Sequence, residues 1–256
     1  MEKKGQVTIF VIIGIVIVAF AVLVYLFYPK ISSTFGFTEE TPSSYIQKCV
    51  EDSVKNSIGK IATQGGSLDP ENYYLYKDQK LEYLCYTNLD YLTCVMQQPM
   101  LKKHFEEEIA KDVQGKVQEC VQGMKTNFKN KGYDIQVSGE GFAVEILPKR
   151  INLKINQAVS LTKAEESQKY EFLSVGAESE IYELISIAES ILNWEASYGS
   201  AETTIYMNYY HNLKVEKLKQ SDGTTVYILT NRDSGEKFQF ASRSIAWPSG
   251  YGATAI

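Results

Sequence analysis

The stretch LKKHFEEEIAKDVQGKVQECVQGMKTNF, Leu101 to Phe128, carries an apolar residue at nearly every third or fourth position. This spacing matches the repeat of an α-helix and predicts one long amphipathic helix after Pro99. Its apolar positions are Leu101, Phe105, Ile109, Val113, Val117, Val121, Met124 and Phe128. The polar face mixes both signs of charge without a basic excess, so we interpret the stripe as protein core and not as a membrane-surface helix.

A second helix is predicted upstream, beginning at Pro42, where a proline is tolerated in a first turn. Its apolar positions also recur at helical spacing: Ile46, Val50, Val54, Ile58 and Ile61. Two consecutive glycines, Gly65 and Gly66, are expected to end it.

The chain contains four cysteines, Cys49, Cys85, Cys94 and Cys120. Cys49 and Cys120 lie beside the apolar stripes of the two helices, so we pair them. Cys85 and Cys94 flank a segment with asparagine and aspartate between β-prone arms, which predicts a hairpin and a second disulfide. By chain entropy, loops of roughly 72 and 10 residues would contribute about 4.4 and 2.7 kcal/mol. The spacings lack close Cys-x-x-Cys pairs, so no zinc site is expected.

The period changes to two after Gly132, which indicates strands. Residues 135–137 and 142–146 predict a hairpin through a turn with two glycines, and 151–155 continue the alternation. Four further strands are expected at Thr204–Tyr210, Lys214–Lys219, Thr225–Asn231 and Lys237–Ser242.

One helix is predicted within this β-rich half, from Glu178 to Tyr198. Its apolar residues form one face, acidic residues occupy the first turn, and Gly199 follows the end. A single helix packed on an antiparallel sheet gives an α+β fold class.

The segment Ile9–Tyr28 contains no charged residue and is apolar throughout. A helix of about 20 residues crosses the roughly 30 Å hydrocarbon layer, so we expect one N-terminal transmembrane helix. A cleaved secretory signal has a shorter apolar core and a small-residue cleavage site, whereas Tyr25, Phe27 and Tyr28 close this one. Lys3 and Lys4 precede the span, which predicts a cytoplasmic N-terminus and an extracellular C-terminal region.

The residues leading into this span carry a family resemblance. Lys4, Gly5 and Gln6, followed directly by the apolar segment, resemble the class III signal of archaeal type IV pilins and related surface proteins. The resemblance implies cleavage after Gly5, with Gln6 as the mature N-terminus. Many pilins carry a glutamate at the fifth mature position, where this sequence has Phe10, so we expect short or minor assemblies instead of long filaments. An uncleaved signal anchor is the alternative.

Several other stretches resemble a group of uncharacterised, membrane-anchored archaeal proteins. These are residues 64–66, 84–87, 94–99, 227–230 and 238–242. The resemblance implies the same topology and cysteine pairing and carries no activity.

The sequence contains no residues whose type and spacing indicate a catalytic or metal-binding site. His104 and His211 have no metal-ligand spacing, and we expect both on the surface. Glu106, Glu107 and Glu108 are adjacent on a helix, so they should point apart on a solvated face. A glycan-binding surface of tyrosines with Trp194 and Trp247 is possible in principle, but packing in core and sheet explains these aromatics better. No local catalytic motif is present.

These observations predict the following organisation: a signal-like segment and transmembrane helix at 1–30, a tether at 31–41, a helical region with four cysteines and a hairpin at 42–131, an α+β domain at 132–246, and a flexible tail at 247–256. The expected function is that of a pilin-like structural or surface-interaction subunit, not an enzyme. The alternatives are a monomeric signal-anchored binding module and, third, an anchored hydrolase. Expected partners are the lipid bilayer and copies of itself or other surface proteins. The net charge of −5 argues against nucleic acid, and no cofactor or metal is expected.

Overall fold

The computed structural model describes residues 13–20, 22–23 and 40–246. The chain divides into two units, Met1–Thr41 and Pro42–Ile256, which we describe separately. The predicted cleavage site at Lys4, Gly5 and Gln6, residues 31–39 of the predicted tether and the tail at 247–256 lie outside the described residues.

The predicted transmembrane helix is not supported. Within the expected span Ile9–Tyr28, residues 13–20 and 22–23 are helical, and the rest falls outside the described residues. In the ranges that the structure covers, no helix combines the length and the apolar character needed to cross a membrane.

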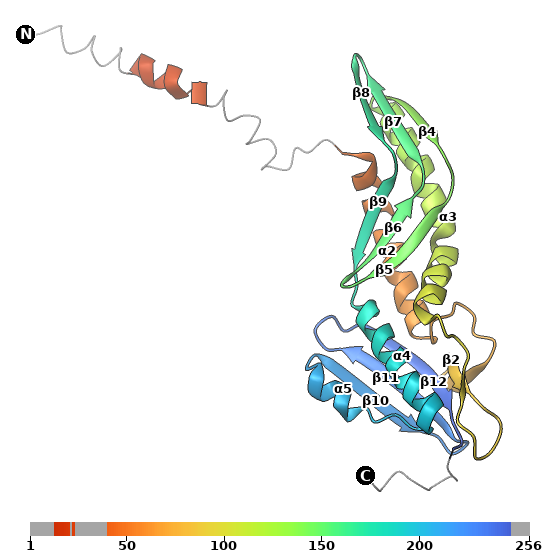
Figure 1. Cartoon of the computed structure of the whole chain (residues 1–256). Coiled ribbons are helices and arrows are strands. Elements are labelled where there is room, and N and C mark those ends of the chain that lie inside the picture. Colours follow the sequence, from red (N-terminus) through yellow and green to blue (C-terminus); the bar gives the residue numbers. More distant parts are fainter. Residues whose placement is uncertain (1–12, 21, 24–39, 247–256) are drawn as a thin grey trace, which may run out of the picture. The chain divides into compact units, whose positions relative to one another are not determined.

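Two long helices of the second unit, α2 (Pro42–Ala62) and α3 (Leu101–Asn130), lie side by side (Figure 1). Both helices were predicted, and their apolar stripes are buried as expected. A disulfide joins Cys49 of α2 to Cys120 of α3, with the two Cα atoms 5.8 Å apart. The predicted second disulfide, between Cys85 and Cys94, is also present.

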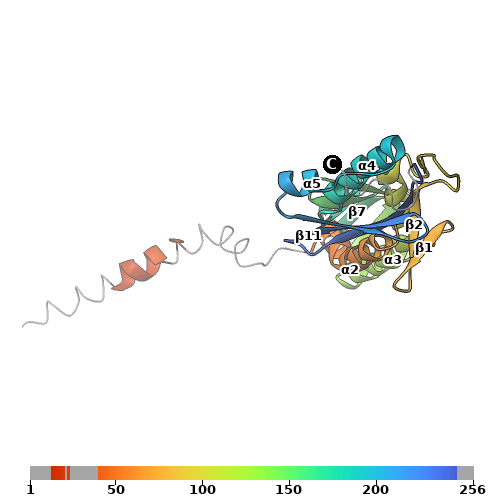
Figure 2. The same ribbon diagram turned by 90° about the horizontal axis from the view of Figure 1, so that it is seen from below.

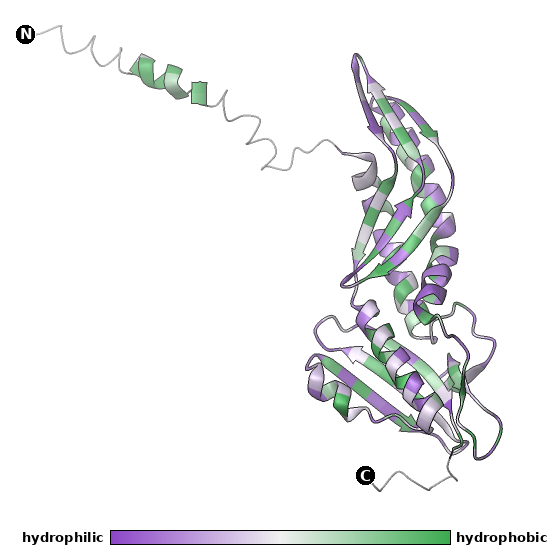
Figure 3. Cartoon of the chain, viewed as in Figure 1, coloured by the Kyte–Doolittle hydropathy of each residue, from purple (hydrophilic) through white to green (hydrophobic). Residues whose placement is uncertain are grey.

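Six strands form a meander against this helix pair: β4 (Asp134–Ser138), β5 (Phe142–Leu147), β6 (Arg150–Ile155), β7 (Ala158–Lys163), β8 (Glu166–Tyr170) and β9 (Leu173–Glu178). They make two antiparallel sheets, in the orders β4-β7-β8 and β5-β6-β9. The six strands lie on three long segments, 134–147, 150–163 and 166–178. Each segment is interrupted near its middle and contributes one strand to each of the two sheets. Buried and exposed residues alternate along β5, β6 and β9. Figure 3 shows hydrophobic and hydrophilic residues interspersed along these strands.

The predicted hairpin between residues 135–137 and 142–146 is wrong. β4 pairs with β7 and β5 pairs with β6, so the two predicted arms do not pair with each other. Gly139 has a φ of 93°, and a Cβ there would lie 2.6 Å from the carbonyl oxygen of Asn156. The glycine therefore permits close contact with the neighbouring segment at a break in the strand, and it does not reverse the chain.

Both edges of the β5-β6-β9 sheet are bound by side chains of the helix pair. On β9, the Gln47 side chain of α2 donates to the oxygen of Gly176 at 2.6 Å and accepts from its nitrogen at 2.8 Å. On β5, the nitrogen of Ile146 donates to a carboxylate oxygen of Glu106, on α3, at 2.8 Å. These bonds satisfy edge groups that would otherwise be open to pairing with another chain.

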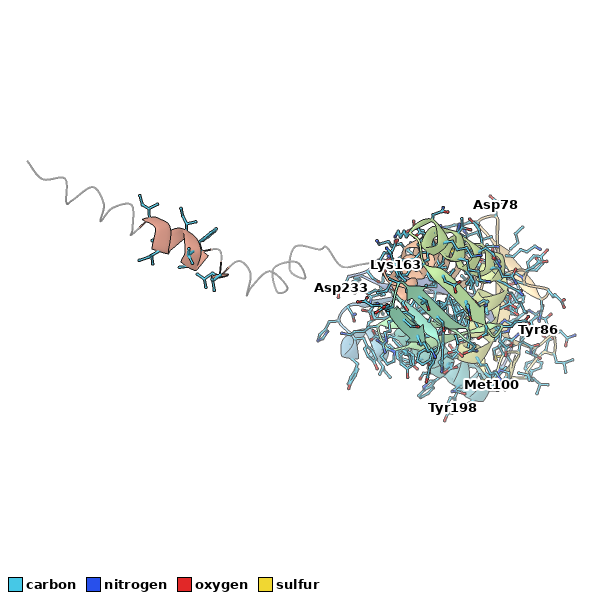
Figure 4. The ribbon with its side chains drawn as sticks, turned by 90° about the horizontal axis from the view of Figure 1, so that it is seen from above. Asp78, Tyr86, Met100, Lys163, Tyr198 and Asp233 are labelled. Carbon is cyan, nitrogen blue, oxygen red and sulfur yellow. A yellow bond between two sulfur atoms is a disulfide. The ribbon has the colours of Figure 1, made fainter. Side chains whose placement is uncertain are left out.

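The remaining strands form a six-stranded sheet: β1 (Tyr73–Tyr76), β2 (Gln79–Tyr86), β3 (Val95–Met96), β10 (Leu213–Lys219), β11 (Thr224–Asn231) and β12 (Lys237–Arg243). The order is β1-β2-β12-β11-β10, with β3 paired to β2. β2 and β12 run parallel and all other pairs are antiparallel. Figure 4 marks two of its turns, the β1–β2 turn at Asp78 and the β11–β12 turn at Asp233, on opposite sides of that view.

Two helices lie on the same side of this sheet, α4 (Ile181–Tyr198) and α5 (Thr204–Tyr209) (Figure 2). The predicted helix at 178–198 starts three residues late, because Glu178 still pairs with Arg150 in the meander. It ends as expected at Gly199, with a φ of 78°. The predicted strand at Thr204–Tyr210 is wrong, since this segment forms α5.

The boundary predicted at 131/132 does not separate two domains. Residues 42–256 form one compact unit, because β2 from the first region pairs with β12 from the second. The core is continuous as well, with Phe105 of α3 against Phe238 of β12 at a ring distance of 6.0 Å. The α+β class with disulfides and antiparallel sheets is confirmed, but the strands of the described residues form three sheets where a single one was predicted.

We predict that Gln47→Ala lowers the free energy of unfolding by about 1 kcal/mol, because two hydrogen bonds to the edge of β9 are lost. Amide exchange at Gly176 should become faster in the same variant. The control is Gln118→Ala, an exposed glutamine of α3, which should change stability by less than about 0.5 kcal/mol. Equal effects of the two substitutions would contradict the role assigned to Gln47.

Candidate functional site

A groove of about 800 Å³ lies where α2, the meander and the six-stranded sheet converge. On α2 it is lined by Lys55, Ile58, Gly59, Ala62 and Thr63, which share one face of the helix. The opposite wall comes from the β5–β6 turn at Lys149, the junction of β9 and α4 at 178–181, and the β11–β12 turn and start of β12 at 234–237. This volume falls in the range of small-molecule sites.

The floor of the groove is apolar and its middle is open. Ile58, Ala62 and Ile181 are each at most 4% exposed and belong to the core. A Cβ added at Gly59 or Gly235 would meet no atom within 4 Å. The two glycines therefore leave free space above a rigid floor.

Glu236, which lines the groove, binds the two residues that precede α4. Its carboxylate accepts a hydrogen bond from the Ser179 hydroxyl at 2.7 Å and another from the nitrogen of Glu180. A negative charge is favourable there, because the first turn of a helix carries unpaired N–H groups and the positive end of its dipole. Glu236 thus places its negative charge at the N-terminal end of α4.

The rim of the groove carries charges of both signs. Lys55 is bound to Glu51 on the preceding turn of α2, at 2.6 Å. Nearby, burial raises the pKa of Glu183, the Glu180 carboxylate raises it further, and Lys149 opposes both. The charges at this end of α4 are close enough to influence one another.

A second polar cluster lies apart from the groove, between the turn after α2, β2 and the first turns of α3. The Ser67 hydroxyl donates to the Glu82 carboxylate and lies 2.7 Å from Nε2 of His104. Glu108 accepts from the nitrogen of Leu68 at 2.8 Å and also binds Lys111.

The pKa values of the two glutamates in this cluster are shifted in opposite directions. Burial raises the pKa of Glu82, although the Ser67 hydroxyl and the nearby His104 oppose this effect. Burial also acts to raise the pKa of Glu108, but the hydrogen bonds from Lys111 and Leu68 outweigh it and the net shift is downward. Glu82 therefore favours its protonated form more than an ordinary glutamate does.

The cluster contains a serine, a histidine and carboxylates, but not in the order of a hydrolytic triad. In a triad the carboxylate orients the histidine, which in turn activates the serine. Here Glu82 contacts the serine directly, and Glu108 is bound to Leu68 and Lys111. Ser67 is only 6% exposed and does not line the groove. We interpret the cluster as a link between three elements.

A third network surrounds Glu195 of α4, which is 2% exposed. Its carboxylate accepts from the hydroxyl of Tyr227, from the Ser242 hydroxyl at 3.1 Å and from the nitrogen of Ala201 at 3.1 Å. Burial, the Glu195 charge and the hydrogen bond to it raise the pKa of Tyr227 well above its ordinary value. This buried and saturated network holds α4 to the sheet.

The residues singled out in the sequence are dispersed. His211 is exposed, as expected, whereas His104 is half-buried against Ser67, which corrects the prediction of a surface histidine. The three consecutive glutamates do point apart, but only Glu107 is exposed: Glu106 bonds β5 and Glu108 is buried. Trp194 packs beside Tyr198, and Trp247 lies outside the described residues. Among the residues described, no three His, Cys, Asp or Glu side chains are grouped to hold a metal.

Sequence reasoning missed the groove entirely. Its residues come from four separate segments whose proximity depends on strand pairing. The only local signals were Gly59 within a helical pattern and the Ser-Gly turn at 234–235.

Comparison of the chain with protein-family models, with curated proteins and with solved structures finds no match. Function is therefore argued from the geometry and from the sequence.

We predict that Glu82→Gln becomes more stable relative to the wild type as pH rises. The raised pKa of Glu82 means that the folded wild type holds its proton more tightly than the unfolded chain, so wild-type stability falls as pH rises above about 4.5 toward the folded-state pKa. The glutamine keeps hydrogen-bonding capacity toward Ser67 and does not titrate. Denaturant unfolding across this pH window measures the difference, with the exposed Glu107→Gln as control. Parallel stability curves for wild type and Glu82→Gln would refute the prediction.

Proposed function

We propose that this chain is a membrane-anchored, extracytoplasmic protein that acts as a structural or surface-interaction subunit of pilin-like type. The observation that carries the proposal is the oxidation of all four cysteines in one compact unit, as Cys49–Cys120 and Cys85–Cys94. Disulfides persist in oxidising compartments and are rare in the reducing cytosol. An extracytoplasmic location is consistent with this pairing.

The anchoring part of the proposal rests on sequence. The apolar segment Ile9–Tyr28 has the length of a membrane span, and the lysines before it favour a cytoplasmic N-terminus. The pilin-like part rests on Lys4, Gly5 and Gln6. Phe10 opposes extended filaments, because a mature amine buried in an apolar filament core would need another partner for its charge.

We predict cleavage before Gln6 and only short or minor assemblies. Intact-mass and N-terminal analysis of protein from native membranes measures the cleavage, and size analysis of detergent extracts measures the assemblies. Gly5→Leu is the matched variant, since loss of the glycine should block processing. A chain that keeps Met1 would rule out the pilin-like reading and leave an anchored binding protein.

A monomeric, anchored binding module is the second candidate, favoured by the groove. An apolar floor with a polar rim and open space above two glycines is the usual composition of a ligand site. In this role the α2–α3 pair and the meander act as a rigid support for the groove.

We predict that Gly59→Leu blocks ligand binding without loss of folding. The added side chain enters open space in the groove, and replacing a helical glycine should raise stability by about 0.5–1 kcal/mol. Gly115→Leu on α3 is the matched control, because that exposed helical glycine also has no atom within 4 Å of an added Cβ. Ligand-observed NMR with small molecules and short peptides, using the full chain in detergent, should give hits that Gly59→Leu abolishes and Gly115→Leu retains. Hits that survive Gly59→Leu, or no hits at all, would reject the groove as a binding site.

A further inference from the structure

This inference rests on the second candidate function and concerns the chemical class of ligand that the groove takes. Four charged side chains that line it, Lys149, Lys237, Glu178 and Glu180, form no ion pair within 4.0 Å in the part of the chain described. Two are positive and two are negative. The uncommitted charge of the rim therefore sums to zero while both signs remain available.

The other two charges of the rim are already used inside the protein. Lys55 is bound to Glu51, and Glu236 is bound to Ser179 and to the first turn of α4. A ligand would therefore meet the four uncommitted groups before it could compete for these two.

The four groups start from well-defined backbone positions. Lys149 sits in the two-residue β5–β6 turn with a φ of 64°, and Lys237 is the first residue of β12. Glu178 is the last residue of β9, and Glu180 is the N-cap of α4. The attachment points of both charge types are thus held by secondary structure around the same apolar floor.

A purely anionic ligand would be attracted to the lysines and repelled by the glutamates, and a purely cationic ligand would meet the reverse. A ligand with both charges and an apolar part matches the rim and the floor together, because complementary charge favours one partner and penalises the others. We propose that the groove binds a short zwitterionic peptide, with its carboxylate toward Lys149 and Lys237, its ammonium toward Glu178 and Glu180, and an apolar side chain on Ile58 and Ile181.

The test uses the tripeptide Ala-Leu-Ala and the full chain in detergent. Calorimetric titration compares the free tripeptide at millimolar concentration with its N-acetylated and C-amidated forms. We expect binding of the free form, with each blocked terminus weakening it roughly two- to fivefold, as for solvent-exposed ion pairs.

Charge reversal then assigns the carboxylate. The double variant Lys149→Glu and Lys237→Glu should weaken binding of the free tripeptide but not of the amidated form, which lacks the carboxylate. Lys169→Glu, an exposed lysine on β8 outside the groove, is the control and should change neither.

Three results would overturn the zwitterionic assignment: no binding of the free tripeptide, equal binding of free and blocked forms, or equal effects of the double variant on both forms. If other ligands are then found whose binding Gly59→Leu abolishes, the binding role of the groove stands and only the ligand class fails. If Gly59→Leu abolishes nothing, both proposals fail.

Discussion

The contact between α2 and α3 is the interaction on which the rest of the second unit depends. Buried apolar stripes hold the two helices together, and the Cys49–Cys120 bridge closes a long loop between them, which restricts the unfolded chain. The meander then binds to both helices through Gln47 and Glu106 at its two edges. Phe105 of α3 packs against Phe238 of β12, so the same core continues into the six-stranded sheet. Each layer is thus attached to this pair directly.

The groove is a consequence of that arrangement. Helix α2, the meander and the six-stranded sheet meet at this point, where a turn, a strand end and a helix start face the same side of α2. Glycines at 59 and 235 add no side chains to fill the space. By contrast, the buried polar groups around Glu195 and around Ser67 form hydrogen bonds within the protein. Removing one partner of such a network leaves a buried polar group unpaired, so these clusters specify packing more than they offer chemistry.

The two proposed roles require the same structural features of the second unit. Disulfide-stabilised helices support an α+β unit, and the groove is lined by residues of α2, the meander and the six-stranded sheet. A subunit of an assembly and a binding module would both need such a rigid body. They differ in what the N-terminal segment does after synthesis and in whether the groove is occupied.

The sequence by itself determined the elements whose pattern is local. The helical spacing of Leu101–Phe128 and of the segment after Pro42 predicted α3 and α2, and Gly199 marked the end of α4, because each signal lies within a few turns. The cysteine pairing also followed, since two cysteines lay beside the two stripes and two flanked a turn. Only the tertiary structure decided which strands pair. The parallel β2–β12 contact, the meander and the groove join residues far apart in the chain. Alternation of apolar and polar residues in the sequence predicts which face of a strand is buried, but it does not identify the neighbouring strand. The same limit explains α5, where packing of Tyr206 and Met207 against the core overrides the β-preference of the segment.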